Sequence, residues 1–146
     1  MSRKYARENA FKVVFTDIKE ENSLNWEELA SEEKDGEIWS GKAPGEEDRK
    51  YIENVCTGVK EHAAQIDETI GKYLRGWAID RINRVCLAAL RVAVYEMKYL
   101  DGIPVKVSAA EAVAIVKKYA DEKEGKFVNG VLGEYIKNEL SDQKEN

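Results

Sequence analysis

Apolar side chains recur at helical spacing along most of this chain. Phe11, Val14 and Ile18 share one stripe at ~100° per residue, which predicts a helix over residues 3–19. Between residues 52 and 70 apolar positions recur every three or four residues, which predicts a second helix that follows Pro44 and Gly45. Residues 79–100 are apolar on most sides and predict a central, enclosed helix.

The later boundaries are predicted from turn and capping signals. "DGIP" (101–104) is typical of a turn, and "SAAE" (108–111) has the form of a capping box that would open the next helix. "DEKEG" (121–125) reads as a charged turn, so the last helix is expected to begin with "GKFVNGVLGEYI" (125–136) and to continue to Leu140. A short helix is expected at 24–34. With no alternating pattern of a strand, six or seven helices in one all-α domain over residues 1–146 are predicted.

Composition supports a helical globule and argues against a metal site. The chain is 43% hydrophobic and 35% charged, with ten glycines and two prolines, so few residues interrupt long helices. Cys56 and Cys86 fall within apolar helical patterns, which favours buried free thiols over zinc ligands. His62 lies on an apolar stripe, where a half-buried side chain is expected rather than a catalytic base.

The negative charge is concentrated in one segment. The net charge is −5, but residues 20–50 contain eleven acidic and four basic side chains, a net −7. The other residues carry 19 basic and 17 acidic groups, a net +2, so a local basic face for nucleic acid is compatible with the acidic total. With no signal peptide and no run of 18 apolar residues, we expect a cytoplasmic protein with no membrane association.

The sequence contains little that resembles an enzyme. Glycine-rich phosphate loops are missing, and the single histidine has no evident nucleophile partner. We therefore expect no catalytic residues, no metal and no cofactor, and take a binding module as the default.

One candidate binding feature is the start of the first helix. Continued backwards, its apolar stripe reaches Arg7 and Arg3, with Lys4 beside them. Cations at a helix N-terminus oppose the helix dipole, which suggests a use for their charge, although a frayed and solvated start is equally compatible.

Three blocks in this order resemble one family closely: "LRVAVYEM" (90–97), "IPVKVSAAEAVAIVKKYA" (103–120) and "KFVNGVL" (126–132). With the Arg-bearing first helix and the Tyr73, Leu74 and Trp77 pattern, the chain is similar to the NusB family of bacterial transcription antitermination factors. The resemblance implies an all-α fold of two small helical bundles packed across one another. It also implies binding of boxA RNA together with NusE, a small-subunit ribosomal protein, in a transcription elongation complex with RNA polymerase that reads through terminators in ribosomal RNA operons.

The resemblance also implies the residues of the site. RNA would be contacted by cations, aromatic rings and an amide, the groups that hold single strands: Arg3, Lys4, Arg7, Tyr73, Lys126, Phe127 and Asn129. The partner protein would be contacted by Arg91, Tyr95 and Glu96, for which inter-helix hydrogen bonds or salt bridges are the structural alternative.

The chain departs from the family pattern at two places. The basic start is only "SRKYAR" (2–7), so a low affinity for RNA in the absence of a partner is expected. Cys86 and Leu87 stand where many members have an Asp-Arg pair, which suggests a drier helix contact and a patch that favours self-association. The net −7 of residues 20–50 and the short basic start favour, as the alternative, a homodimeric interaction module whose RNA contact occurs only in a ternary complex. NusB-like domains also occur fused to RNA cytosine methyltransferases, which offers a third, enzymatic class. We do not expect it here, because a further catalytic domain would not fit within 146 residues.

Overall fold

The computed structural model describes residues 3–19 and 45–140 of the chain. Within them it contains six α-helices and no strand. The helices are α1 (Arg3–Lys19), α3 (Glu46–Glu61), α4 (Ala63–Lys72), α5 (Arg84–Tyr99), α6 (Val105–Tyr119) and α7 (Glu122–Tyr135), with a 3-10 turn η2 (Ile79–Arg81) and a π-helical turn η3 (Ile136–Leu140). The all-α prediction is confirmed, and the helix expected at 24–34 lies outside the described residues.

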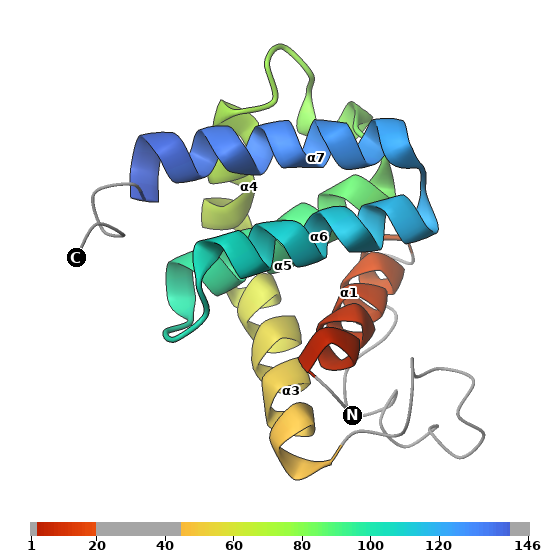
Figure 1. The fold of residues 1–146 in the computed structure, drawn as a ribbon, viewed down its shortest axis with the longest axis vertical. Coiled ribbons are helices and arrows are strands. Elements are labelled where there is room, and N and C mark those ends of the chain that lie inside the picture. The colour runs from red at the N-terminus through yellow and green to blue at the C-terminus, as the bar shows by residue number, and fades with distance from the viewer. Residues whose placement is uncertain (1–2, 20–44, 141–146) are drawn as a thin grey trace.

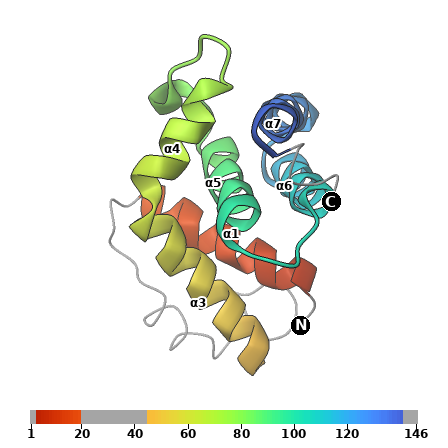
Figure 2. The same ribbon diagram turned by 90° about the vertical axis from the view of Figure 1, so that its left-hand side faces the viewer.

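Helix α5 is the centre of the fold. It contacts α1, α3, α4, α6 and α7 (Figure 1), and Figure 2 shows α4 and the α6–α7 pair on opposite sides of it. Helices α1 and α3 pack on each other, as do α6 and α7, and in both views α6 lies between α1 and α7. Every residue from Cys86 to Glu96 other than Arg91 is buried, so the predicted enclosed helix is confirmed.

The predicted apolar stripes form the core. Phe11 and Val14 of α1 are buried and Ile18 packs against the core, as their spacing predicts. Along α7 the same holds for Val128, Leu132 and Tyr135. Burial of one large apolar side chain stabilises the fold by about 1.5–3 kcal/mol, so these stripes fix how α1 and α7 lie against α5.

Four predicted boundaries are wrong. The helix expected to cross residue 62 ends there, because the chain turns at His62 between α3 and α4. Within 79–100 the chain first forms η2, and α5 begins only after Asn83, whose side chain accepts a hydrogen bond from the Val85 N–H. Helix α6 starts at Val105, directly after Pro104, whose fixed φ suits a helix start. Ser108 of the predicted capping box therefore lies inside the helix and does not cap it. Instead of a turn, 121–125 is the start of α7, capped by the Asp121 carboxylate, which accepts from the Glu124 N–H at 2.8 Å.

The cysteines and the single histidine behave largely as predicted. Cys56 and Cys86 are free and buried. His62 is partly buried and stacks on Tyr99 with ring centroids 4.1 Å apart. Cys86 is 0% and Leu87 is 3% exposed, so these two residues form no surface patch, and the self-association expected from them is not supported.

The described residues contain neither a metal-binding cluster nor a membrane-spanning helix. None of their His, Cys, Asp and Glu side chains cluster in a way that could hold a metal ion. None of the helices in the described ranges has the length and apolar character needed to cross a membrane.

Candidate nucleic-acid interface

A buried ion pair fixes the start of α1. Arg7 is 3% exposed, and its Nε donates to both carboxylate oxygens of Glu96, at 3.0 and 2.8 Å. Burial lowers the pKa of Arg7, but the neighbouring Tyr51 and Glu96 raise it by more, so the guanidinium keeps its charge. A buried charge needs such a partner, because an unpaired one would be strongly destabilising.

Glu96 is the acceptor at which four helices meet. Besides Arg7 from α1, it accepts the Tyr51 hydroxyl from α3 and the Ser108 hydroxyl from α6, the latter at 2.8 Å. Burial, followed by the charge of Glu96, raises the pKa of Tyr51, so its hydroxyl stays protonated and can donate. Glu96 on α5 is 0% exposed, and its lone pairs are occupied by these donors.

This network holds the exposed cations at the first turn of α1. The Arg3 guanidinium lies over the Tyr51 ring, 4.3 Å from its centroid, in a cation–π contact. Arg3 and Lys4 are exposed. Arg7 was expected to contact RNA and Glu96 to contact the partner protein. Because both side chains are buried against each other, the structure supports a different role for them, which is to position α1.

A second group of residues surrounds Phe127 on α7. A surface pocket of about 290 Å³ is lined by Trp77, Arg81, Ile82, Asn83, Lys123, Glu124 and Phe127. Trp77 is 61% exposed, and Phe127 is partly buried against the core. The Glu124 carboxylate accepts from the Cys86 thiol at 3.0 Å and is therefore committed to the protein.

The turn before η2 places Trp77 beside α7. Gly76 has φ +92, a conformation that side chains other than glycine rarely adopt, and it lets the chain reverse after Arg75. Arg75 then pairs with Glu134 of α7 at 2.8 Å, which ties the turn to the helix that carries Phe127.

The other predicted RNA residues lie at separate places. Lys126 and Asn129 are exposed on α7. Tyr73 is partly buried near the other end of α7, where its hydroxyl donates to Glu139 at 2.5 Å and its ring lies 6.1 Å from that of Tyr135. The structure thus groups Lys126 and Phe127, while α6 separates them from Arg3 and Lys4 on α1.

The two remaining residues predicted to contact a partner protein are already engaged within the fold. Arg91 forms a bidentate pair with Asp67 of α4, at 2.9 and 2.7 Å, and is half-buried. Tyr95 is 7% exposed and donates to Asn54, and its ring lies against Gly58 of α3. These contacts match the structural alternative of inter-helix bonds, and a partner contact by Arg91 and Tyr95 stays a prediction.

Several exposed groups near the site were not predicted from the sequence. Trp77 was noted as part of a motif but not as a site residue, and its neighbours Arg81 and Lys123 had no signal of their own. Where α1 meets α6, Tyr5 is 41% and Tyr119 is 38% exposed. Glu8 of α1 accepts hydrogen bonds from Lys118 at 2.9 Å and from the Tyr119 hydroxyl at 2.6 Å. Which loop or helix lies beside which depends on tertiary packing, so spacing alone could not group these residues.

Exposed cations and aromatic rings on a rigid all-helical scaffold define a class of binding domain suited to nucleic acid. The chain belongs to the NusB family, whose pattern it matches over residues 4–137. It is 39% identical to the transcription antitermination protein NusB of Agathobacter rectalis, over 92% of this chain and 99% of that protein. It is 38% identical to the protein of the same name from Acetivibrio thermocellus, over 96% of this chain and 92% of that one.

Solved structures that contain NusB superpose on this chain. NusB of T. maritima superposes with a TM-score of 0.84 at 29% identity, covering 99% of this chain and 97% of that one. A chain in a crystal structure of the antitermination factors NusB and NusE in complex with double-stranded RNA superposes with a TM-score of 0.74 at 34% identity, covering 92% of this chain and 96% of that one.

Proposed function

We propose that this chain is a transcription antitermination factor that binds boxA-type single-stranded RNA together with NusE and promotes processive transcription of ribosomal RNA operons by RNA polymerase. Its relatives carry the name of antitermination proteins, and a 34% identical solved chain is found with NusE and RNA. The surface chemistry of this chain supports the RNA part of the proposal.

The observation that carries the proposal is the pocket on α7. The aromatic residues Trp77 and Phe127 line the same pocket as the cations Arg81 and Lys123. Aromatic faces bind unstacked bases and cations bind phosphates, which is the combination that proteins use for single strands. A regular duplex keeps its bases stacked inside, so exposed rings of this kind favour single-stranded RNA over a duplex.

The start of α1 would add a second contact. Arg3 and Lys4 are exposed cations on a helix end that the Arg7–Glu96 pair holds in place. Lys126 and Asn129, exposed on α7, would contact the strand nearer the α7 pocket. An extended strand that reaches both places would cross α6, which lies between the two helices. Few cations are involved in total, which is consistent with an RNA affinity that depends on the partner.

The experiment compares single variants in a titration of labelled boxA RNA with NusE present. Because stacking contributes about 1–3 kcal/mol per base, Trp77→Ala and Phe127→Ala are each expected to weaken binding by roughly 5-fold or more. Lys50→Ala is the control for charge and surface changes, since Lys50 is an exposed cation on α3. Unchanged affinity in the Trp77→Ala/Phe127→Ala double variant, with the fold intact by circular dichroism, would overturn the assignment of the pocket.

The homodimeric alternative now has less support. The apolar pair at 86 and 87, which suggested a patch for self-association, is buried in the core. The net −7 of residues 20–50 and the short basic start still favour it. Sedimentation of the chain with and without NusE distinguishes the two readings, because a dimer that persists in the presence of NusE is expected only from the alternative.

A further inference from the structure

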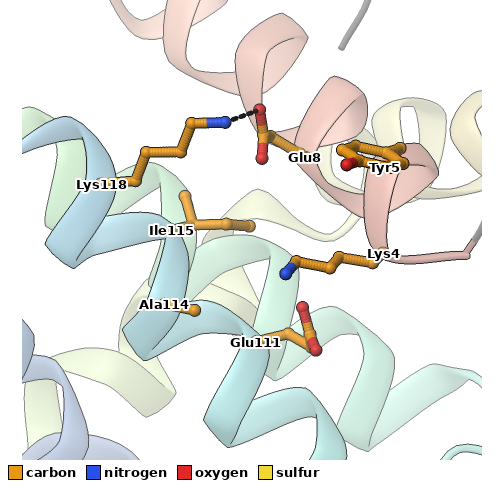
Figure 3. A pocket seen from close by; sticks show the side chains of 7 residues that line it. All are labelled: Lys4, Tyr5, Glu8, Glu111, Ala114, Ile115 and Lys118. Carbon is orange, nitrogen blue, oxygen red and sulfur yellow. Dashed lines mark hydrogen bonds and ion pairs between the residues drawn. The ribbon is translucent and has the colours of Figure 1, made fainter. Parts of the chain in front are cut away.

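A pocket of about 150 Å³ lies between α1 and α6 and is separate from the α7 pocket (Figure 3). It is lined by Lys4, Tyr5, Glu8, Glu111, Ala114, Ile115 and Lys118. Lys4, Tyr5 and Glu8 come from the first turns of α1, and the other residues come from α6. The pocket therefore adjoins the exposed cations at the start of α1 that the proposed function uses.

The two carboxylates of this pocket differ in what they bind. Glu8 is committed to the fold, because one of its oxygens accepts from both Lys118 and the Tyr119 hydroxyl, and its side chain is 5% exposed. Glu111 is partly exposed and makes no hydrogen bond or ion pair with any residue in the described part of the chain. Figure 3 shows its carboxylate facing the pocket and the Lys4 amine, with no bond between them.

A carboxylate of this kind has acceptor capacity to offer a ligand. An ionised carboxylate has about four lone-pair positions and no donor, so it binds best to two adjacent N–H groups. Two cations lie near Glu111, namely Lys4, which lines the same pocket, and the buried Arg7. Burial lowers the pKa of Arg7, while Tyr51, Glu96 and Glu111 raise it, which places the guanidinium within electrostatic reach of Glu111.

Only one of the four RNA bases presents two adjacent donors on its Watson–Crick edge. Guanine has N1–H beside the N2 amino group, whereas adenine and cytosine have one amino group next to an acceptor nitrogen, and uracil has one N–H between two carbonyls. Unpaired bases of single-stranded RNA are read on this edge. A free carboxylate in a pocket that admits an unpaired RNA base would therefore select guanine.

We propose that the α1–α6 pocket reads a guanine of the bound RNA, with the Glu111 carboxylate accepting from its N1–H and N2 amino groups. This inference rests on the proposed function and names a specificity residue for it. The Tyr5 ring, 41% exposed at the rim, provides a face for stacking, and the Ile115 and Ala114 side chains provide an apolar wall. Lys4 and Lys118 lie where they can contact the flanking phosphates or the guanine O6.

The test uses labelled uridine oligomers of about 12 nucleotides that carry one guanosine, or one inosine at the same position. Inosine lacks the N2 amino group and keeps N1–H, so it removes one of the two proposed bonds. In fluorescence titrations with NusE present, the chain is expected to bind the guanosine RNA about 10-fold more tightly than the inosine RNA. Glu111→Gln places an amide N–H against the base donors, so this variant is expected to bind the two RNAs within about 2-fold of each other.

Glu68→Gln on α4 is the matched control, because it makes the same change at an exposed glutamate on another helix. It is expected to keep the wild-type preference. Equal binding of the two RNAs by the wild-type chain would overturn the inference, as would a Glu111→Gln variant that keeps the full preference. In both cases the proposed function would stand, since it fails only if no RNA binds at all, boxA RNA included.

Discussion

Arg7 and Glu96 lie 89 residues apart in the chain and form a buried ion pair, with 2.8 Å between Nε of one and Oε2 of the other. The pair joins the second turn of α1 to the last turn of α5. Tyr51 and Ser108 donate to the same carboxylate, so α3 and α6 are fixed at the same point. The position of the exposed cations Arg3 and Lys4 therefore depends on Arg7, a residue that is itself buried.

Loss of the acceptor at position 96 is expected to lower the free energy of unfolding. Glu96→Ala leaves the Arg7 guanidinium buried without a counter-charge and two hydroxyls without their acceptor. We expect the free energy of unfolding to fall by about 3–5 kcal/mol, measured by urea denaturation. Adding Arg7→Met, which removes the stranded charge, is expected to recover part of this loss. If the double variant is as unstable as Glu96→Ala alone, the ion pair is not the source of the effect.

Two glycines provide a matched test of the packing of α3 on α5. A Cβ at Gly58 would overlap the Tyr95 ring, whereas a Cβ at Gly71 of α4 would meet nothing within 4 Å. Gly58→Ala is therefore expected to lower the free energy of unfolding by about 1–3 kcal/mol through overpacking. Gly71→Ala is expected to leave it unchanged or to raise it by about 0.5–1 kcal/mol, because alanine favours the helix. Equal effects at the two positions would contradict the close approach of Tyr95 to α3.

Both thiols are expected to resist alkylation in the folded chain. Burial, followed by the nearby Asp17, raises the pKa of Cys56 from 9.0 to about 12, and burial with a hydrogen bond to Glu124 raises the pKa of Cys86. At pH 8 little thiolate is present and the sulfur atoms are covered. Iodoacetamide is expected to label neither cysteine in buffer and both in concentrated denaturant, as read by mass spectrometry. Rapid labelling of the folded chain at either position would contradict the buried placement.

Stability is expected to fall at alkaline pH because of Tyr135. Burial, together with the charge of Glu139, raises the pKa of Tyr135 from 10.0 to about 12. Above pH 10 this phenol ionises in the unfolded chain but not in the folded chain. Deprotonation therefore lowers the free energy of the unfolded state, and stability decreases towards pH 12. The loss from this residue is on the order of 1 kcal/mol.

Tyr135→Phe removes the titrating group and keeps the ring in the core. Urea midpoints at pH 8 and pH 11 are expected to differ less for this variant than for the wild-type chain. If the variant loses as much stability as the wild-type chain, Tyr135 does not contribute to the alkaline transition.

Periodicity was sufficient to predict the helices, and it failed mainly at their ends. The stripes through Phe11, Val14 and Val128 are decided by burial of apolar surface, which sequence spacing records directly. The "SAAE" capping box failed because Ser108 is used by a tertiary partner, Glu96, that lies 12 residues before it. Capping signals describe local competition for hydrogen bonds, and a buried carboxylate nearby outweighs them.

The candidate site was only partly predictable for the same reason. Arg7 shares its residue type and stripe with Arg3, but one is buried and the other exposed, and the difference comes from Glu96 on another helix. The grouping of Trp77 with Phe127 depends on the turn at Gly76 and on the Arg75–Glu134 pair. Sequence identified the chemistry of the side chains, and tertiary packing decided which of them reach the surface together.

The central claim is that this chain binds boxA RNA as one component of a complex with NusE. A titration of labelled boxA RNA with the chain alone, and then with an equimolar mixture of the chain and NusE, tests it most directly. We expect weak binding by the chain alone and binding at least about 10-fold tighter with NusE, with both affinities falling as salt rises. Binding of the RNA by neither the chain nor the mixture at low salt would contradict the account.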